Sequence, residues 1–250
     1  MPIAWMHRLT GRDRSTAANL QLGWVLTFVA GAVNAGGFLA VGRYTSHMTG
    51  IVSAVADDLA LGFSRLALAG AVAVASFVLG AMCTAWLSNA ARRSGLHSEY
   101  AAPLMLEAVL LLLFGLMGAS LHLATDVVLP ATVLLLCFIM GLQNAVITKV
   151  SKAQIRTTHV TGLLTDLGIE LGRLLYWNRT PLGAALQVRA DPERLRIHAS
   201  LLACFFGGAV LGALAFKHLG YAATLPLAAG LTLLAAPPLW TDLRQRQARP

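Results

Sequence analysis

Long apolar stretches without charged residues alternate along the chain with short polar segments. Six of these stretches can each supply the roughly 20 residues that a helix needs to cross a bilayer. They are too long for strands, and they lack the period-two alternation of an outer-membrane barrel. The pattern therefore predicts six transmembrane helices, at residues 22–42, 66–88, 103–122, 127–148, 197–216 and 220–240.

The composition excludes a soluble protein. Only 12% of the 250 residues are charged and 57% are hydrophobic, with a mean hydropathy of +0.68. A soluble domain carries about 25% charged residues, because its surface must face water. The cysteines Cys83, Cys137 and Cys204 each lie alone inside a predicted span, without a metal-type or redox spacing. We therefore predict neither a metal site nor any other cofactor.

Basic residues are distributed unevenly between the predicted loops. Because cytoplasmic loops of membrane proteins are rich in Lys and Arg, the distribution predicts a multi-pass protein with both termini in the cytoplasm. The loops on the other side hold Arg43 and Arg65, offset by Asp57 and Asp58, and later Lys217. The basic residues assigned to the cytoplasmic side are Arg8, Arg12, Arg14, Arg92, Arg93, Lys149, Lys152, Arg156, Arg173, Arg179, Arg189, Arg194, Arg196, Arg244, Arg246 and Arg249.

The same distribution accounts for the net charge of +8 and the isoelectric point near 10.1. We assign the basic residues to anionic lipid head groups at the bilayer surface and expect no nucleic-acid partner. A full crossing by residues 46–62 would move Arg92 and Arg93 to the outer side. Because that crossing would also bury the Asp57–Asp58 pair at a high cost, six spans fit better than eight.

A polar motif occurs twice in the chain. Residues 45–50 read Thr-Ser-His-Met-Thr-Gly, and residues 157–162 read Thr-Thr-His-Val-Thr-Gly. Each copy follows an apolar span with a Gly-x-x-Asn step, which ends at Asn34 in the first case and at Asn144 in the second. The repeat divides the chain into a cytoplasmic N-terminal segment, two halves of three spans and a cytoplasmic C-terminal tail, at residues 1–21, 22–122, 127–240 and 241–250.

Three spans per half is an odd number, so the second half is expected to be inverted relative to the first. Inverted repeats commonly hold a substrate or ion site near the middle of the membrane, where broken or re-entrant helices meet. We therefore predict an all-α polytopic membrane protein. Its six transmembrane helices form two inverted three-helix repeats, each with a short polar half-helix or re-entrant segment.

Each copy of the motif carries side chains suited to binding a solute or an ion. On a helix, Asp166 and Glu170 share a face with His159, as Asp58 does with His47. Imidazoles exchange protons near neutral pH, and the motif threonines can hydrogen-bond a solute. The alternative is structural, with threonines that cap the following helix and a glycine that permits close packing. The spacing within each copy does not fit a metal site.

Further polar residues lie inside the predicted spans. Glu107 lies in the third span, where an ionisable residue indicates a functional site by default, although it is near enough to the cytoplasmic end to reach the interface. Asn34 and Asn144 either line a pathway or hydrogen-bond between helices. The predicted solute or ion pathway comprises Asn34, His47, Thr49, Asp58, Glu107, Asn144, His159, Thr161, Asp166 and Glu170.

The two motif copies, the Gly-x-x-Asn spans and the six-span plan together resemble the YoaK-like family of bacterial inner-membrane proteins of unknown function. The resemblance covers residues 20–240. It implies a polytopic helical fold in a bacterial cytoplasmic membrane. It implies no activity, substrate or catalytic residue.

The sequence favours an integral membrane transporter or channel for a small solute or ion, with its pathway between the two repeats. A structural or assembly role without transport is the first alternative. An intramembrane enzyme is a weaker alternative, because no Ser/His or HExxH catalytic spacing is present, and we expect no enzymatic activity. The solute, its coupling ion and its direction are left open, as is a homo-oligomer.

Overall fold

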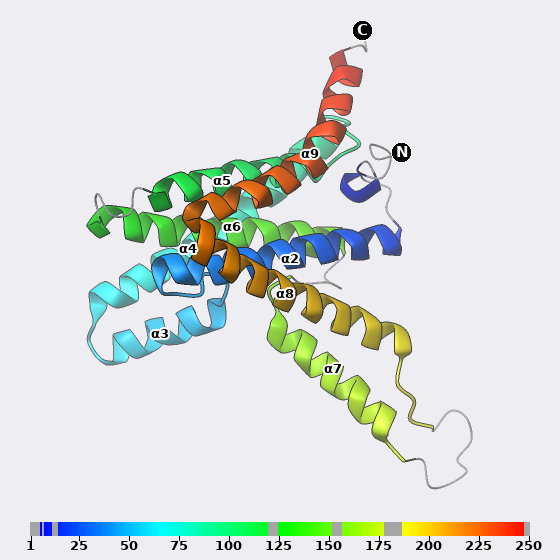
Figure 1. Cartoon of the computed structure of the whole chain (residues 1–250), viewed down its shortest axis with the longest axis horizontal. Helices are drawn as coiled ribbons and strands as arrows, with labels where there is room; N and C mark the ends of the chain where they lie inside the picture. The colour runs from blue at the N-terminus through cyan, green and yellow to red at the C-terminus, as the bar shows by residue number, and fades with distance from the viewer. Residues whose placement is uncertain are drawn as a thin grey trace.

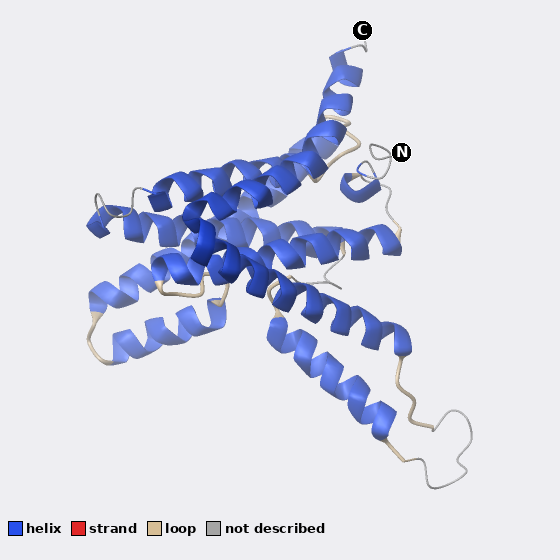
Figure 2. Cartoon of the chain, viewed as in Figure 1, coloured by secondary structure: helices blue, strands red, loops and turns tan. Residues whose placement is uncertain are grey.

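The computed structural model describes residue 6 and residues 8–11, 15–119, 125–151, 157–177 and 187–247. Every regular element in these residues is a helix and none is a strand, which confirms the predicted all-α class (Figures 1 and 2). The elements are α2 Thr16–Val41, α3 Met48–Ala60, α4 Ser64–Arg93, α5 Ala101–Ala119, α6 Thr125–Val150, α7 Val160–Leu175, α8 Pro192–Leu219, the short 3-10 helix η2 Gly220–Ala223, and α9 Thr224–Gln247.

Several helices are long and apolar enough to cross a membrane, as the sequence predicts. In the described part of the chain they form five candidate segments, Thr16–Val41, Ser64–Arg93, Ala101–Ala119, Asp126–Val150 and Pro192–Gln245. The last candidate has 54 residues and contains both α8 and α9. These two helices are separated at η2, where Gly220 adopts the positive φ of 57° that favours glycine.

The longest packing contacts join helices from different halves of the sequence. Helix α2 packs along α8, α4 packs along α6, and α5 packs along α9. Between α2 and α8, the backbones approach so closely that a Cβ on Gly31 would collide with the carbonyl oxygen of Phe205. In the same way a Cβ on Gly208 would collide with the carbonyl oxygen of Phe28. Glycines that permit such an approach are the usual basis of helix association in lipid.

The pair of α4 and α6 repeats this contact. A Cβ on Gly141 of α6 would collide with the carbonyl oxygen of Phe77, and one on Gly80 of α4 with that of Phe138. The Thr84 hydroxyl adds a 2.8 Å hydrogen bond to the carbonyl oxygen of Leu142. Glycine and phenylalanine therefore occupy matching places in both pairs, with α6 in the place of α2 and α4 in the place of α8.

Two shorter helices follow the polar motif copies. Helix α3 has 13 residues and packs on α4, and α7 has 16 residues and packs on α8. At 1.5 Å per residue they are roughly 20 and 24 Å long, which is less than the roughly 30 Å hydrocarbon core. Figure 1 shows that both begin near the middle of the long axis and run toward opposite ends of the molecule.

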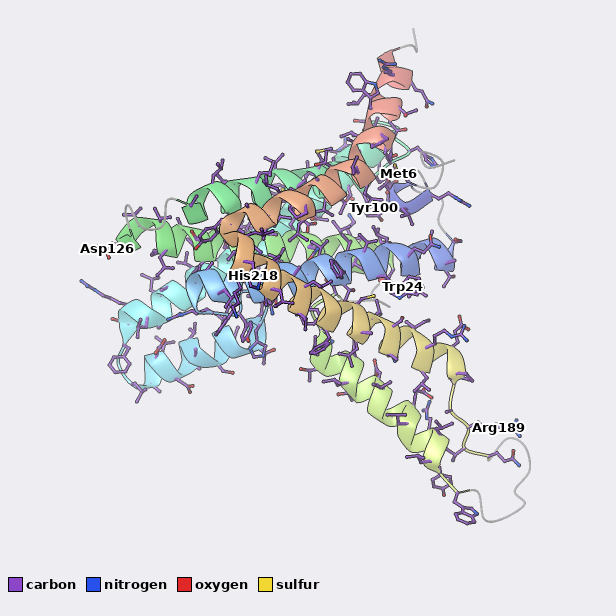
Figure 3. The ribbon with its side chains drawn as sticks, viewed as in Figure 1. Met6, Trp24, Tyr100, Asp126, Arg189 and His218 are labelled. Atoms are coloured by element: carbon purple, nitrogen blue, oxygen red, sulfur yellow. The ribbon has the colours of Figure 1, made fainter. Side chains whose placement is uncertain are left out.

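The direction of the long helices also alternates along this axis. Figure 3 labels Asp126, near the start of α6, at one end and Arg189, in the α7–α8 connection, at the other. Helix α2 begins and α9 ends on the same side as Arg189 (Figure 1). The predicted boundary between the halves, at residues 123–126, lies partly outside the described residues, which omit 120–124. Six of the basic residues behind the predicted orientation also lie outside them: Arg12, Arg14, Lys152, Arg156, Arg179 and Arg249.

Candidate functional site

The first polar motif folds back along the helix that precedes it. Helix α2 ends at Gly42, which has a φ of 67° and donates its N–H to the carbonyl oxygen of Phe38. The Ser46 hydroxyl then donates a 2.8 Å hydrogen bond to Oδ1 of Asn34. Asn34 lies roughly 10 Å before the end of α2, at 1.5 Å per residue. Residues 43–47 therefore return alongside α2, and we call them the first return segment.

The second motif is held in the same way. Oδ1 of Asn144 accepts hydrogen bonds from the hydroxyls of Thr157, at 3.2 Å, and Thr158, at 2.9 Å. Its Nδ2 donates to the carbonyl oxygen of Met140 at 2.8 Å. Thr158 occupies the motif position of Ser46, so residues 157–159 form the described part of a second return segment. Each Gly-x-x-Asn asparagine thus holds the motif that follows it, and the predicted alternative of a bond between two spanning helices is wrong.

Both motif histidines stand at the start of a short helix. His47 and His159 are the N-cap residues of α3 and α7, with similar backbone angles and without a side-chain capping bond. Each imidazole lies over the first turn, since a Cβ on Gly50 or Gly162 would collide with its Nδ1. The glycine of the motif therefore leaves the space that the imidazole ring occupies. The rings stay exposed, beside helix N-termini whose free N–H groups carry a partial positive charge.

The motif threonines do not cap the helices as the structural alternative supposes. Thr49 and Thr161 are exposed in the first turns of α3 and α7. One turn further along α7, the Thr165 hydroxyl donates a 2.9 Å hydrogen bond to the carbonyl oxygen of Thr161. Two hydroxyls thus remain available at the start of the short helices.

The carboxylates predicted to share a face with the histidines lie far along that face. Eleven residues separate Asp58 from His47 and Glu170 from His159, which corresponds to roughly 16 Å along a helix axis. These two carboxylates therefore lie too far from the histidines to bind one small ion together with them. Asp58 is half-buried near the end of α3, and its carboxylate makes no hydrogen bond within the described part of the chain.

Glu170 and Asp166 belong to a separate pocket between α7, α8 and the start of α2. The pocket has a volume of about 510 Å³, and we call it the α7–α8 pocket. Glu170 is buried and accepts 2.8 Å hydrogen bonds from Arg173 and from the backbone N–H of Asp191. Asp166 lies 3.8 Å from Nε2 of His198. The lining residues are Thr16, Asn19, Leu20, Ser151, Asp166, Ile169, Glu170, Arg173, Asp191, Glu193, Arg194, Ile197 and His198.

Glu107 lies in the interior of the bundle and does not reach an interface, so that predicted alternative is wrong. Its side chain is fully buried in α5, and neither carboxylate oxygen has a hydrogen-bond partner. Gln143 of α6 is also buried; its Nε2 donates to the carbonyl oxygen of Leu26 at 3.2 Å, while its Oε1 has no partner. A buried carboxyl without a partner is costly, and such residues commonly mark ion or proton pathways. Glu107 does not line the α7–α8 pocket.

Sequence reasoning missed His198. Its place in the first turn of the predicted span 197–216 was a usable signal, because imidazoles are rare in such spans. Its proximity to Asp166 depends on how α7 packs against α8. Among the described residues, no group of three or more His, Cys, Asp and Glu is arranged to hold a metal ion.

These features define a polytopic α-helical membrane protein in which a return segment and a short helix occur twice. The chain belongs to DUF1275, a family of proteins of unknown function, whose model matches residues 22–236. This match confirms the resemblance to a family of unknown function that the motifs indicate. No curated protein and no solved structure matches the chain.

Proposed function

We propose that the protein is an integral membrane transporter or channel for a small solute or ion. Six helices would cross the membrane in two inverted halves, with the pathway between them. The observation that carries the proposal is the repeated unit of an asparagine-held return segment and a short helix, at Asn34 and Ser46 and again at Asn144 and Thr158. Paired units of this kind form the central site of many secondary transporters.

The opposite directions of α3 and α7 support an inverted arrangement (Figure 1). Each short helix would span only part of the membrane, and the non-helical return segment before it would also lie within the membrane. Such irregular backbone is tolerated where it is buried in protein or lines a cavity. With the basic residues in the cytoplasm, the α7–α8 connection and both termini would face the cytoplasm of a bacterial cell. The α3–α4 turn would face the opposite side.

The chemistry of the pathway follows from the ends of the short helices. His47 and His159 present exposed imidazoles there, next to the hydroxyls of Thr49 and Thr161. These groups, with the partial positive charge of the helix N-termini, can exchange protons and hydrogen-bond a polar solute. Asn34 and Asn144 would set the position of both ends. The buried carboxyl of Glu107 and the half-buried one of Asp58 would complete the pathway.

A structural or assembly role is the competing explanation. It requires that the motif residues act only through packing, so their variants would lose stability without a specific effect on flux. The proposal assigns no catalytic step to the chain. It also requires no second protein, although a homo-oligomer is compatible with it.

The test is solute flux into proteoliposomes that contain the purified chain. A panel of labelled inorganic cations, amines, amino acids and sugars identifies a transported solute, and the variant His47→Ala/His159→Ala is then compared with the native chain. We expect its flux to fall to the level of empty liposomes while its thermal stability stays close to native. The control variant His97→Ala removes an exposed histidine outside the motif and should leave flux unchanged. Native flux in the double variant would overturn the assignment of the pathway.

A further inference from the structure

The α7–α8 pocket is built by residues from separate parts of the chain. The start of α2 contributes Asn19, the end of α6 is followed by Ser151, and α7 and α8 supply the remaining wall. Its volume of about 510 Å³ is within the range of small-molecule sites. A site that needs four elements to form depends on the tertiary fold, unlike a charged helix surface.

Among the described residues that line this pocket, carboxylates outnumber guanidinium groups. Each arginine of the lining is paired: Arg173 lies 2.8 Å from Glu170, and Arg194 lies 3.4 Å from Asp191. The carboxylates of Asp166 and Glu193 line the same pocket, and neither has an arginine or lysine partner among the described residues. Because both guanidinium groups are already neutralised, the pocket is suited to a cation and poorly suited to an anion.

His198 lies in the wall of the pocket beside Asp166. Its side chain is 16% exposed, and its Nε2 lies 3.8 Å from Asp166. Its Nδ1 is buried without a hydrogen-bond partner. A buried polar atom without a partner is unfavourable unless something else satisfies it. This nitrogen faces the protein interior, so His198 contributes to the pocket through Nε2, on the side of Asp166.

The matching hairpin of the first half has no such pocket chemistry. The glycine contacts align α8 with α4, so that Gly70 takes the place of His198. The motif copies align α7 with α3, so that Ala54 takes the place of Asp166. A Cβ on Gly70 would collide with Val55, and the two helices are thus closely packed there. The shared fold does not require these charged groups, because the first hairpin forms without them.

We propose that the α7–α8 pocket binds the ammonium group of a small organic cation, with Asp166 as its principal partner. This inference rests on the proposed function and deepens it, since the pocket would be the cytoplasmic end of the pathway and would select amines among small solutes. The carboxylate of Asp166 attracts the cation and accepts a hydrogen bond from its ammonium group, beside the imidazole of His198. Glu193 adds a second negative charge at the rim.

The test is isothermal titration of the purified full-length chain in detergent with three four-carbon probes of different charge. Putrescine is a dication, 1,4-butanediol is neutral and succinate is a dianion. We expect binding of putrescine only. The variant Asp166→Asn should weaken it at least about tenfold, the factor that corresponds to losing one charge-assisted hydrogen bond. Asp57→Asn, which removes an exposed carboxylate from α3, is the matched control and should leave binding unchanged.

Several outcomes overturn the inference. Equal binding of butanediol, preferred binding of succinate, no binding of putrescine, or native affinity in a folded Asp166→Asn chain would each do so. Glu193→Gln, in the first turn of α8, provides a second variant should Asp166→Asn fail to fold. Flux of some other solute class without putrescine binding would overturn this site while the transport proposal stands. Putrescine binding without any flux would support the site and count against transport.

Discussion

At the scale of single residues, asparagine and glycine hold the two motifs in place. Asn144 accepts hydrogen bonds from two threonine hydroxyls. Gly162 has no side chain, and the ring of His159 occupies the space where a Cβ would be. In a segment with few alternative partners, losing such an acceptor leaves buried hydroxyls unsatisfied. The position of each histidine thus depends on neighbours that carry no charge.

Replacing Asn144 should weaken the second return segment. We expect Asn144→Ala to lower the free energy of unfolding by about 1–3 kcal/mol, because Thr157 and Thr158 both lose their acceptor. Denaturant unfolding in detergent measures this change. The control is Asn89→Ala, which removes an exposed hydrogen bond from Lys149 and should cost less than about 1 kcal/mol. Equal effects in the two variants would contradict the assigned role of Asn144.

Two glycines of α7 provide a second comparison. A methyl group at Gly162 would collide with His159, whereas nothing lies within 4 Å of a Cβ at Gly168. We expect Gly162→Ala to displace the imidazole, lower the melting temperature and reduce flux. Gly168→Ala should keep flux and gain up to about 1 kcal/mol from helix propensity. Thermal unfolding and the flux assay measure both effects. A native melting temperature and native flux in Gly162→Ala would show that the imidazole of His159 does not pack against this position.

The sequence revealed these residues without revealing their roles. The doubled motif identified His47, His159 and the two asparagines, because chemistry repeated at matching positions can be read directly. It did not reveal that each asparagine binds its own motif, since that bond exists only after the chain folds back. Helix periodicity placed Glu170 on the face of His159 correctly, but it gave no account of the distance along the axis.

At the scale of helices, close backbone contacts decide which elements pair. The pairs α2–α8 and α4–α6 use the same arrangement of glycine against phenylalanine backbone. Lipid-facing and protein-facing surfaces of such helices are equally apolar, so packing by small residues supplies the specificity. Hydropathy therefore predicted where the long helices lie and could not predict their partners.

A methyl group at one of these contacts should separate the helices. Gly141→Ala would collide with the backbone of Phe77, which cannot move aside as a flexible side chain can. We expect a loss of about 1–3 kcal/mol in stability, typical of overpacking. Gly207→Ala, with nothing within 4 Å of its Cβ, is the control on α8 and should be neutral. Unfolding in detergent compares the two, and equal stability would contradict the α4–α6 contact.

At the scale of the whole molecule, each half depends on the other. The partner of α2 is α8 and the partner of α4 is α6, so neither half contains its own main helix pairs. The doubled motif predicted two related halves, yet sequence similarity between them could not show that their helices are exchanged in this way. The central packing therefore follows from tertiary contacts that no local pattern encodes.

This exchange predicts that the halves are unstable alone. We expect residues 1–122 and residues 123–250, expressed separately, to be degraded in membranes, because their glycine contacts lack partners. Expressed together, the two fragments should recover protease resistance. Limited proteolysis followed by immunoblotting measures this, with the intact chain as the reference. Stable, protease-resistant single halves would contradict the exchanged pairing.

The inverted arrangement is tested most directly by the side from which each short helix can be labelled. Leu61 and Tyr176 are the residues that end α3 and α7, and both are exposed. Each is replaced by cysteine in a chain without Cys83, Cys137 and Cys204, and an impermeant thiol reagent is applied to intact cells and to inverted vesicles. We predict labelling of Leu61→Cys in intact cells and of Tyr176→Cys only in inverted vesicles. Labelling of both from the same side would contradict the inverted repeat and the pathway built on it.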